Sequence, residues 1–122
     1  MSATLAERAA AVLLARGIVP PKHRSPEPYF DASGWRWLPH FKTREYTHDC
    51  RAGWLGWVLD LDDDGNKGRL LGVVRDVYGA QWLTAQALMT AGGVHGWRVS
   101  GIDGGGGATE VEALVAALER AP

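Results

Sequence analysis

The sequence predicts an α+β fold in which about three helices pack on a largely antiparallel sheet of about four strands. Three observations support this class. Two capping boxes precede segments with apolar residues at helical spacing, stretches rich in Val, Leu and Trp lie in the central part of the chain, and Gly- or Asp-rich clusters separate these segments. The predicted order is α-β-β-β-α-β-α, in a single domain spanning residues 1–122.

The first element is a helix that begins at Thr4. Thr4 and Glu7 have the spacing of a capping box, in which each side chain accepts a hydrogen bond from the other residue's backbone N–H. The apolar residues that follow recur at helical spacing: Leu5, Ala9, Val12 and Leu13. Gly17 and the prolines beyond it end the helix after about three turns.

The next segments predict a connector and three strands. Residues 18–28 contain four prolines, which favour an extended connector at the surface. Alternation from Trp35 to Leu38 predicts a strand, and the apolar composition of residues 53–61 and 69–78 predicts two more. The Asp- and Gly-rich stretch 62–68 predicts the turn of a hairpin between the last two.

The last part of the chain predicts a helix, a strand and a final helix. Apolar residues return to helical spacing in residues 80–91, and the two glycines that follow predict the end of this helix. Residues 94–102 predict a strand, and residues 103–108 a Gly-rich linker. Thr109 and Glu112 then repeat the capping box before an amphipathic helix.

Composition limits the class of protein. The 46% hydrophobic fraction excludes wholesale disorder, and no apolar run approaches the roughly 20 residues of a membrane span. Cys50 is the single cysteine, so no internal disulfide can form, and a reducing compartment, the cytoplasm, is expected. The net charge of −1 excludes a uniformly basic nucleic-acid binder.

That small net charge conceals two segments of opposite sign. Residues 16–51 contain seven basic and four acidic residues, a balance of +3. Residues 52–122 contain five basic and nine acidic residues, a balance of −4. A partner with an acidic surface is therefore expected to contact the first of these segments.

The most informative segment is 29–46, which holds six of the eleven aromatic residues together with several cations. In a strand, Trp35 and Trp37 project from the same face about 7 Å apart. Because tryptophan and arginine dominate protein interfaces, we expect a binding patch made of Trp35, Arg36, Trp37, His40, Lys42 and Arg44. Secondary candidates are Lys22, Arg24, His48, Cys50 and Arg51.

An alternative places these tryptophans in the core. Burial of tryptophan is strongly favourable, so Trp35 and Trp37 can pack under the helices. The opposite face of the strand and the basic connector would then carry the function. The patterns around the other four tryptophans predict core positions for them: Trp54, Trp57, Trp82 and Trp97.

Three functional hypotheses follow. The favoured one is a non-enzymatic binding or regulatory protein, of inhibitor or immunity type, that engages a protein partner with an acidic surface. The second is nucleic-acid binding by the basic aromatic segment 22–51. The third is a small enzyme that uses His48 or Cys50, although no complete catalytic constellation is present. No cofactor is expected.

Two further patterns resemble ligand sites only in part. Asp60, Asp62, Asp64 and Gly65 match the start of a calcium loop, but its last position is Leu71 instead of a glutamate. The Gly-rich run before Thr109 matches no phosphate-binding fingerprint. A zinc site is not expected either, because only two of its candidate ligands lie close together in the sequence, His48 and Cys50. A polar turn and a flexible linker explain the first two patterns, and no metal site is expected.

Overall fold

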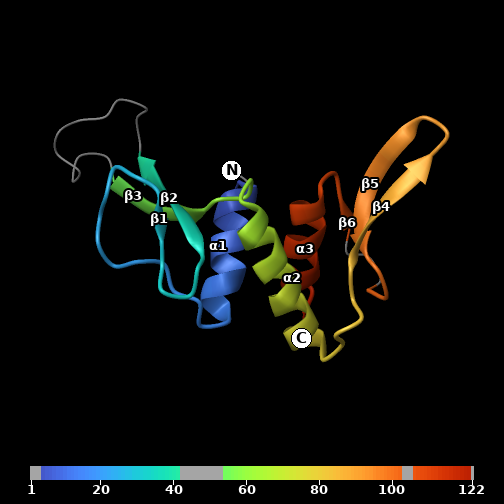
Figure 1. Cartoon of the computed structure of the whole chain (residues 1–122), viewed down its shortest axis with the longest axis horizontal. Helices are drawn as coiled ribbons and strands as arrows, with labels where there is room; N and C mark the ends of the chain where they lie inside the picture. Colours follow the sequence, from blue (N-terminus) through green and yellow to red (C-terminus); the bar gives the residue numbers. More distant parts are fainter. Residues whose placement is uncertain (1–3, 42–53, 103–105, 122) are drawn as a thin grey trace. The chain divides into compact units, whose positions relative to one another are not determined.

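The computed structural model describes residues 4–41, 54–102 and 106–121 (Figure 1). The chain divides into two compact units, residues 1–66 and residues 67–122. Three helices and two three-stranded antiparallel sheets make up the described residues. The α+β class is therefore confirmed, whereas the strands form two small sheets instead of one.

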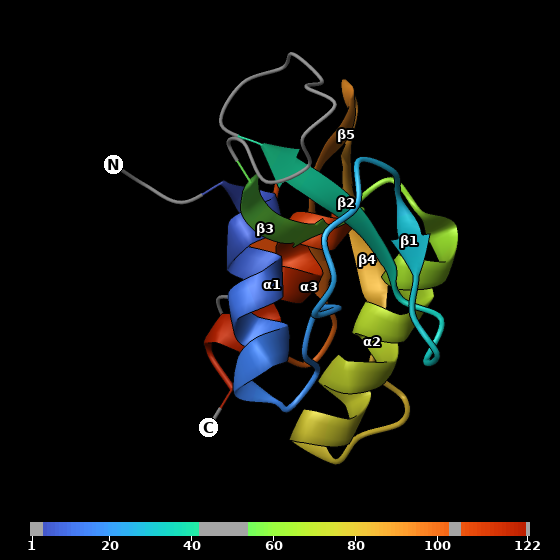
Figure 2. The ribbon, with the colours of Figure 1, turned by 90° about the vertical axis from the view of Figure 1, so that its left-hand side faces the viewer.

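Unit 1 begins with the predicted helix α1 (Leu5–Ala15). The Thr4 hydroxyl accepts a hydrogen bond from the backbone N–H of Glu7 at 3.2 Å, as the capping box requires. At the other end Gly17 adopts a φ of 83°, which lets the N–H of Ile18 reach the carbonyl of Leu13 at 2.9 Å. The helix packs against β3 (Trp54–Leu59), as Figure 2 shows.

The sheet of unit 1 has the order β1 (Tyr29–Phe30), β2 (Arg36–Phe41), β3. Its register places Trp37 opposite both Tyr29 and Leu59, so these three side chains share one face. Trp37 and Leu59 are buried, as is Trp57 further along the same face. The sheet therefore contributes one aromatic face to the core of the unit.

Helix α2 (Asp64–Tyr78) replaces two predicted elements, the turn at 62–68 and the strand at 69–78. The Asp63 carboxylate accepts a hydrogen bond from the N–H of Asn66 at 2.9 Å, so the acidic stretch caps a helix. The buried residues recur four apart, which is helical spacing: Asn66, Leu70 and Val74. Gly79, with a φ of 64°, ends the helix. The predicted strand was wrong because β-branched valines masked this period.

The sheet of unit 2 has the order β4 (Ala85–Thr90), β5 (Gly93–Val99), β6 (Gly106–Gly107). The helix predicted over 80–91 was wrong, since β4 lies there and the glycines after it turn a hairpin. Residues of β4 pair with β5 from Ala85 opposite Val99 to Thr90 opposite Gly93. The strand β6 lies within the predicted linker 103–108, of which residues 103–105 lie outside the described part.

Helix α3 (Glu110–Glu119) covers this second sheet and confirms the last predicted helix. The Thr109 hydroxyl accepts from the N–H of Glu112 at 3.1 Å, and the Glu112 carboxylate accepts from the N–H of Ala108 at 3.3 Å. Its buried side chains are mostly aliphatic: Val111, Ala113, Leu114, Val115, Ala117 and Leu118. This stripe forms the core of unit 2.

Trp82 departs from its predicted core position. Its side chain is 68% exposed and lies against the backbone of Gly101, after β5. A Cβ at Gly101 would overlap the indole ring, and the φ of this residue is 82°. Glycine is thus required at position 101 for the indole to rest there.

None of the helices in the described ranges is long and apolar enough to cross a bilayer.

Candidate protein-binding surface

The two tryptophans of the predicted patch are core residues. Trp35 is 5% exposed and Trp37 is fully buried, so the alternative of burial holds and neither ring lies at the surface. The indole N–H of Trp37 donates to Asp31 Oδ2 at 2.9 Å, which satisfies the buried donor. Five predicted candidates lie outside the described residues: Lys42, Arg44, His48, Cys50 and Arg51.

Asp31 also shapes the turn that leads into β2. Its Oδ1 accepts hydrogen bonds from the N–H groups of Ser33 and Trp35, both at 2.9 Å. An aspartate at the start of a turn commonly makes such bonds to backbone N–H groups nearby. One side chain therefore holds the turn, satisfies Trp37 and positions the following residue, Arg36.

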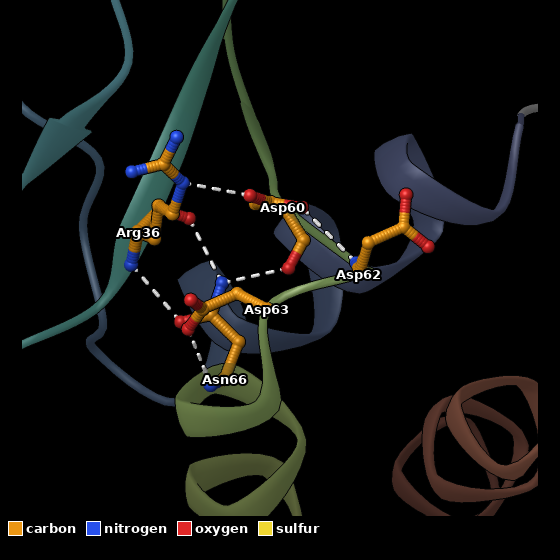
Figure 3. A network of polar contacts seen from close by, with 5 residues as sticks. All are labelled: Arg36, Asp60, Asp62, Asp63 and Asn66. Carbon is orange, nitrogen blue, oxygen red and sulfur yellow. Dashed lines mark hydrogen bonds and ion pairs between the residues drawn. The ribbon is translucent and has the colours of Figure 1, made fainter.

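The backbone of Arg36 is hydrogen-bonded to the side chain of Asn66, which is fully buried. The Arg36 N–H donates to Asn66 Oδ1, and Asn66 Nδ2 donates to the Arg36 carbonyl, both at 2.9 Å (Figure 3). Asn66 Nδ2 also donates to the carbonyl of Asp60 at 2.8 Å. The amide thereby pairs with β2 as a neighbouring peptide would, and fixes the first turn of α2 to the end of the sheet.

The side chain of Arg36 is held in place as well. Its Nε donates to Asp60 Oδ2 at 2.8 Å, and its guanidinium carbon lies 5.1 Å from the centre of the Phe30 ring. The side chain is 31% exposed, and its two terminal nitrogens have no partner among the described residues (Figure 3). A guanidinium held in this way can offer those nitrogens to a carboxylate at little entropic cost.

The edge strand β1, next to Arg36 of β2, consists of two exposed aromatic residues. Tyr29 is 40% exposed and Phe30 is 55% exposed. Consecutive residues of a strand point to opposite faces, so the pair covers both sides of this edge. Sequence reasoning did not select them because it gave the surface role to Trp35 and Trp37. The strand register, which is known only from the structure, pairs Tyr29 with Trp37 and Phe30 with Arg36, so Phe30 and Arg36 lie on the same face.

The connector before β1 is pinned to the same edge. The His23 ring lies 4.5 Å from that of Tyr29 and 5.5 Å from that of Trp57, both in edge-to-face geometry. The Trp57 indole N–H donates to the His23 carbonyl at 2.9 Å. The exposed cations on either side of His23, Lys22 and Arg24, are therefore held beside β1. We call these residues the β1 edge surface: Lys22, Arg24, Tyr29, Phe30 and Arg36.

His40 occupies a different place. It lines a depression of about 370 Å³ together with Glu7, Ala10, Leu55, Trp57 and Val58. His40 lies four positions after Arg36 on β2, which is roughly 13 Å along a strand. No hydrogen bond joins His40 to Glu7 in the described part of the chain. The structure thus places Lys22 and Arg24 on either side of His23, next to Tyr29, and places Arg36 next to Phe30 on the opposite face of β1. His40 lies elsewhere.

The acidic stretch that resembles a calcium loop has structural partners. Asp60 receives the Arg36 guanidinium on Oδ2 and the N–H of Asp62 on Oδ1, at 3.0 Å, while Asp63 caps α2. Across residues 4–41, 54–102 and 106–121, no three side chains of the types that bind metals come together. These contacts make the stretch a helix cap and an anchor for Arg36.

No family model matches the chain, and no match was found among curated proteins or among solved structures.

Proposed function

We propose that the protein is a non-enzymatic binding protein, of inhibitor or immunity type, that engages a protein partner through the β1 edge surface. The observation that carries this proposal is the guanidinium of Arg36, whose Nε is bonded to Asp60 and whose carbon lies over the Phe30 ring, while its terminal nitrogens point away from Asp60 (Figure 3). Arginine and exposed aromatic rings supply most of the energy of protein interfaces. An acidic side chain of the partner is the group that fits Arg36.

Nucleic-acid binding is the second candidate, because exposed aromatics beside Lys22 and Arg24 can stack bases and contact phosphates. The surroundings of Arg36 oppose it. The carboxylate of Asp60 already neutralises part of the positive charge of Arg36. The three aspartates that follow Asp60 in the sequence repel a polyanion. A protein partner can place one carboxylate on Arg36 and keep other charges away from this stretch.

Paired variants test the proposal. The wild-type chain and Phe30→Ala are used to capture partners from the native host lysate, with and without nuclease. Leu14→Ala is the matched control, because Leu14 in α1 is also 55% exposed. We expect a nuclease-resistant protein partner whose affinity falls at least about tenfold in Phe30→Ala and less than about twofold in Leu14→Ala.

The role of Arg36 has its own test. Arg36→Lys keeps the positive charge but removes the planar guanidinium group, which can contact a carboxylate through two nitrogens. We expect about tenfold weaker partner binding from this variant. A partner captured equally well by the wild-type, Phe30→Ala and Arg36→Lys chains would exclude this surface, and capture that disappears with nuclease would favour the nucleic-acid alternative.

A further inference from the structure

The depression lined by His40 in unit 1 has the features of a small-molecule site. Its volume is about 370 Å³, and residues of α1, β2 and β3 line it. The apolar lining residues are Ala10, Leu55, Trp57 and Val58. The polar ones are Glu7 and His40. A mostly apolar lining with a few polar groups is typical of sites that bind small organic molecules.

The Glu7 carboxylate is not used by the helix in which it lies, and in this the two capping boxes differ. In α3 the Glu112 carboxylate accepts a hydrogen bond from the N–H of Ala108 at 3.3 Å. In α1 the corresponding residue is Glu7, whose N–H donates to the Thr4 hydroxyl. Its carboxylate has no hydrogen-bond or ion-pair partner within the described ranges. This carboxylate is therefore available to a ligand in the depression.

The space beside the His40 imidazole is open as well. No hydrogen bond, ion pair or ring contact involves this imidazole in the part of the chain that the structure describes. The register places Gly56 of β3 opposite His40, and a Cβ at Gly56 would meet no atom within 4 Å. Because glycine has no side chain, β3 leaves room at this position. The depression therefore combines an unpaired carboxylate and an unpaired imidazole with an apolar lining.

These groups together select a positively charged organic ligand. We propose that the depression binds a small organic ammonium ion, a primary amine with an apolar body. An ammonium group can donate hydrogen bonds to the Glu7 carboxylate and, when the imidazole is neutral, to His40. The apolar body of such a ligand gains free energy by leaving water for contact with Leu55 and Trp57.

Other classes of ligand fit the depression less well. An anion is repelled by the Glu7 carboxylate. An uncharged apolar molecule covers that carboxylate without giving it a hydrogen bond, which is costly. A metal ion would find the side chains of Glu7 and His40 as its protein ligands, and zinc sites usually have more than these two. An ammonium ion satisfies both polar groups, and its body suits the apolar lining.

Amide NMR spectra recorded during a titration with phenethylammonium test the proposal. This probe joins a primary ammonium group to a flat apolar ring, and hydrocinnamate is its matched anion. We expect saturable shifts at the lining residues, including the indole N–H of Trp57, at about millimolar phenethylammonium. Hydrocinnamate is expected to bind at least about tenfold more weakly, because Glu7 repels its carboxylate.

Two glutamine variants separate ligand binding from helix stability. Glu7→Gln removes the charge and nearly keeps the shape of the side chain, and it is expected to weaken phenethylammonium binding at least about fivefold. Glu110→Gln is the matched control, because Glu110 lies in the first turn of α3 and interacts in the same way with the dipole of its helix. This control is expected to change the affinity less than about twofold.

Several outcomes overturn the proposal. They are the absence of saturable shifts up to about 20 mM phenethylammonium, shifts centred away from the depression, equal binding of hydrocinnamate, and equal effects of the two glutamine variants. The variants that test the β1 edge surface, Phe30→Ala and Arg36→Lys, change no residue that lines the depression. The two proposals therefore succeed or fail separately.

Discussion

At the scale of single residues, the orientation of side chains on β1 and β2 decides what the surface can bind. The aromatic richness of segment 29–46 could be read from the sequence, and so could the two options for Trp35 and Trp37. The choice between them could not, because it depends on the partner strands that cover one face. Burial of both tryptophans leaves Phe30 exposed and Arg36 partly exposed on the other face of the sheet.

Asn66 was not singled out from the sequence, since Arg36, whose backbone it bonds on both sides, lies 30 residues away on β2. Replacement by alanine leaves the buried N–H of Arg36 and the carbonyl of Asp60 without this amide. We expect Asn66→Ala to lower the free energy of unfolding by about 2–4 kcal/mol, measured by urea titration of tryptophan fluorescence.

Gln81→Ala is the control for that measurement. This amide is exposed and makes only a 3.4 Å contact with Asp76, so its loss is expected to change stability by less than about 0.5 kcal/mol. Equal effects of the two substitutions would contradict the role assigned to Asn66.

At the scale of elements, the two terminal helices were predictable. Between them, α2 forms where a turn and a strand were predicted, and β4 forms where a helix was predicted. Capping boxes are local signals, and they located α1 and α3. Over residues 62–78 the glycines and valines favoured a turn and a strand, while the cap from Asp63 and the buried contacts of Asn66 select a helix. For β4, alanine and leucine favoured a helix, and pairing with β5 selects the strand.

The glycines within α2 provide a direct test of this helix. A Cβ added at Gly68 or Gly72 meets no atom within 4 Å, and both residues have helical conformation. Because glycine is a poor helix former, Gly68→Ala and Gly72→Ala are each expected to raise the free energy of unfolding by about 0.5–1 kcal/mol.

Gly79→Ala is the matched control for the α2 glycines. Its Cβ position is equally open, but the φ of 64° penalises any side chain, so this variant is expected to lose about 1 kcal/mol. Thermal unfolding followed by circular dichroism compares the three variants. A loss of stability at Gly68 and Gly72 as well would argue against the helix.

The cap of α3 is expected to contribute measurably to unit 2. Thr109→Ala removes the acceptor for the N–H of Glu112 and should destabilise the protein by about 1 kcal/mol. Thr109→Ser keeps the hydroxyl and should restore most of that loss, again measured by thermal unfolding. If serine behaves like alanine, the hydroxyl is not the source of the effect.

At the scale of the whole molecule, the charge contrast along the sequence does not persist between the units. Arg36 of the basic segment pairs with Asp60 of the acidic segment inside unit 1. Unit 1 contains eight basic and nine acidic residues, and unit 2 contains five of each. Neither unit is strongly charged, so binding is expected to depend on local geometry more than on net charge.

The salt dependence of binding measures this directly. A protein partner that places one carboxylate on Arg36 should show a shallow decline of affinity with ionic strength. A nucleic acid single strand that contacts all three cations of the β1 edge surface should show a slope of log K against log salt of about −2.1. Titration of the partner at several salt concentrations distinguishes the two, and a slope near the larger value would contradict the protein-partner proposal.

The indole resting on Gly101 gives unit 2 an optical signature of its own. Trp82 is largely in water, whereas Trp35, Trp37 and Trp57 of unit 1 are shielded from it. Emission from Trp82 should therefore lie at longer wavelength than emission from these three residues and should be quenched by acrylamide before theirs. Replacing Trp82 by phenylalanine would leave a bluer spectrum, and the difference spectrum would report on unit 2 without an added dye.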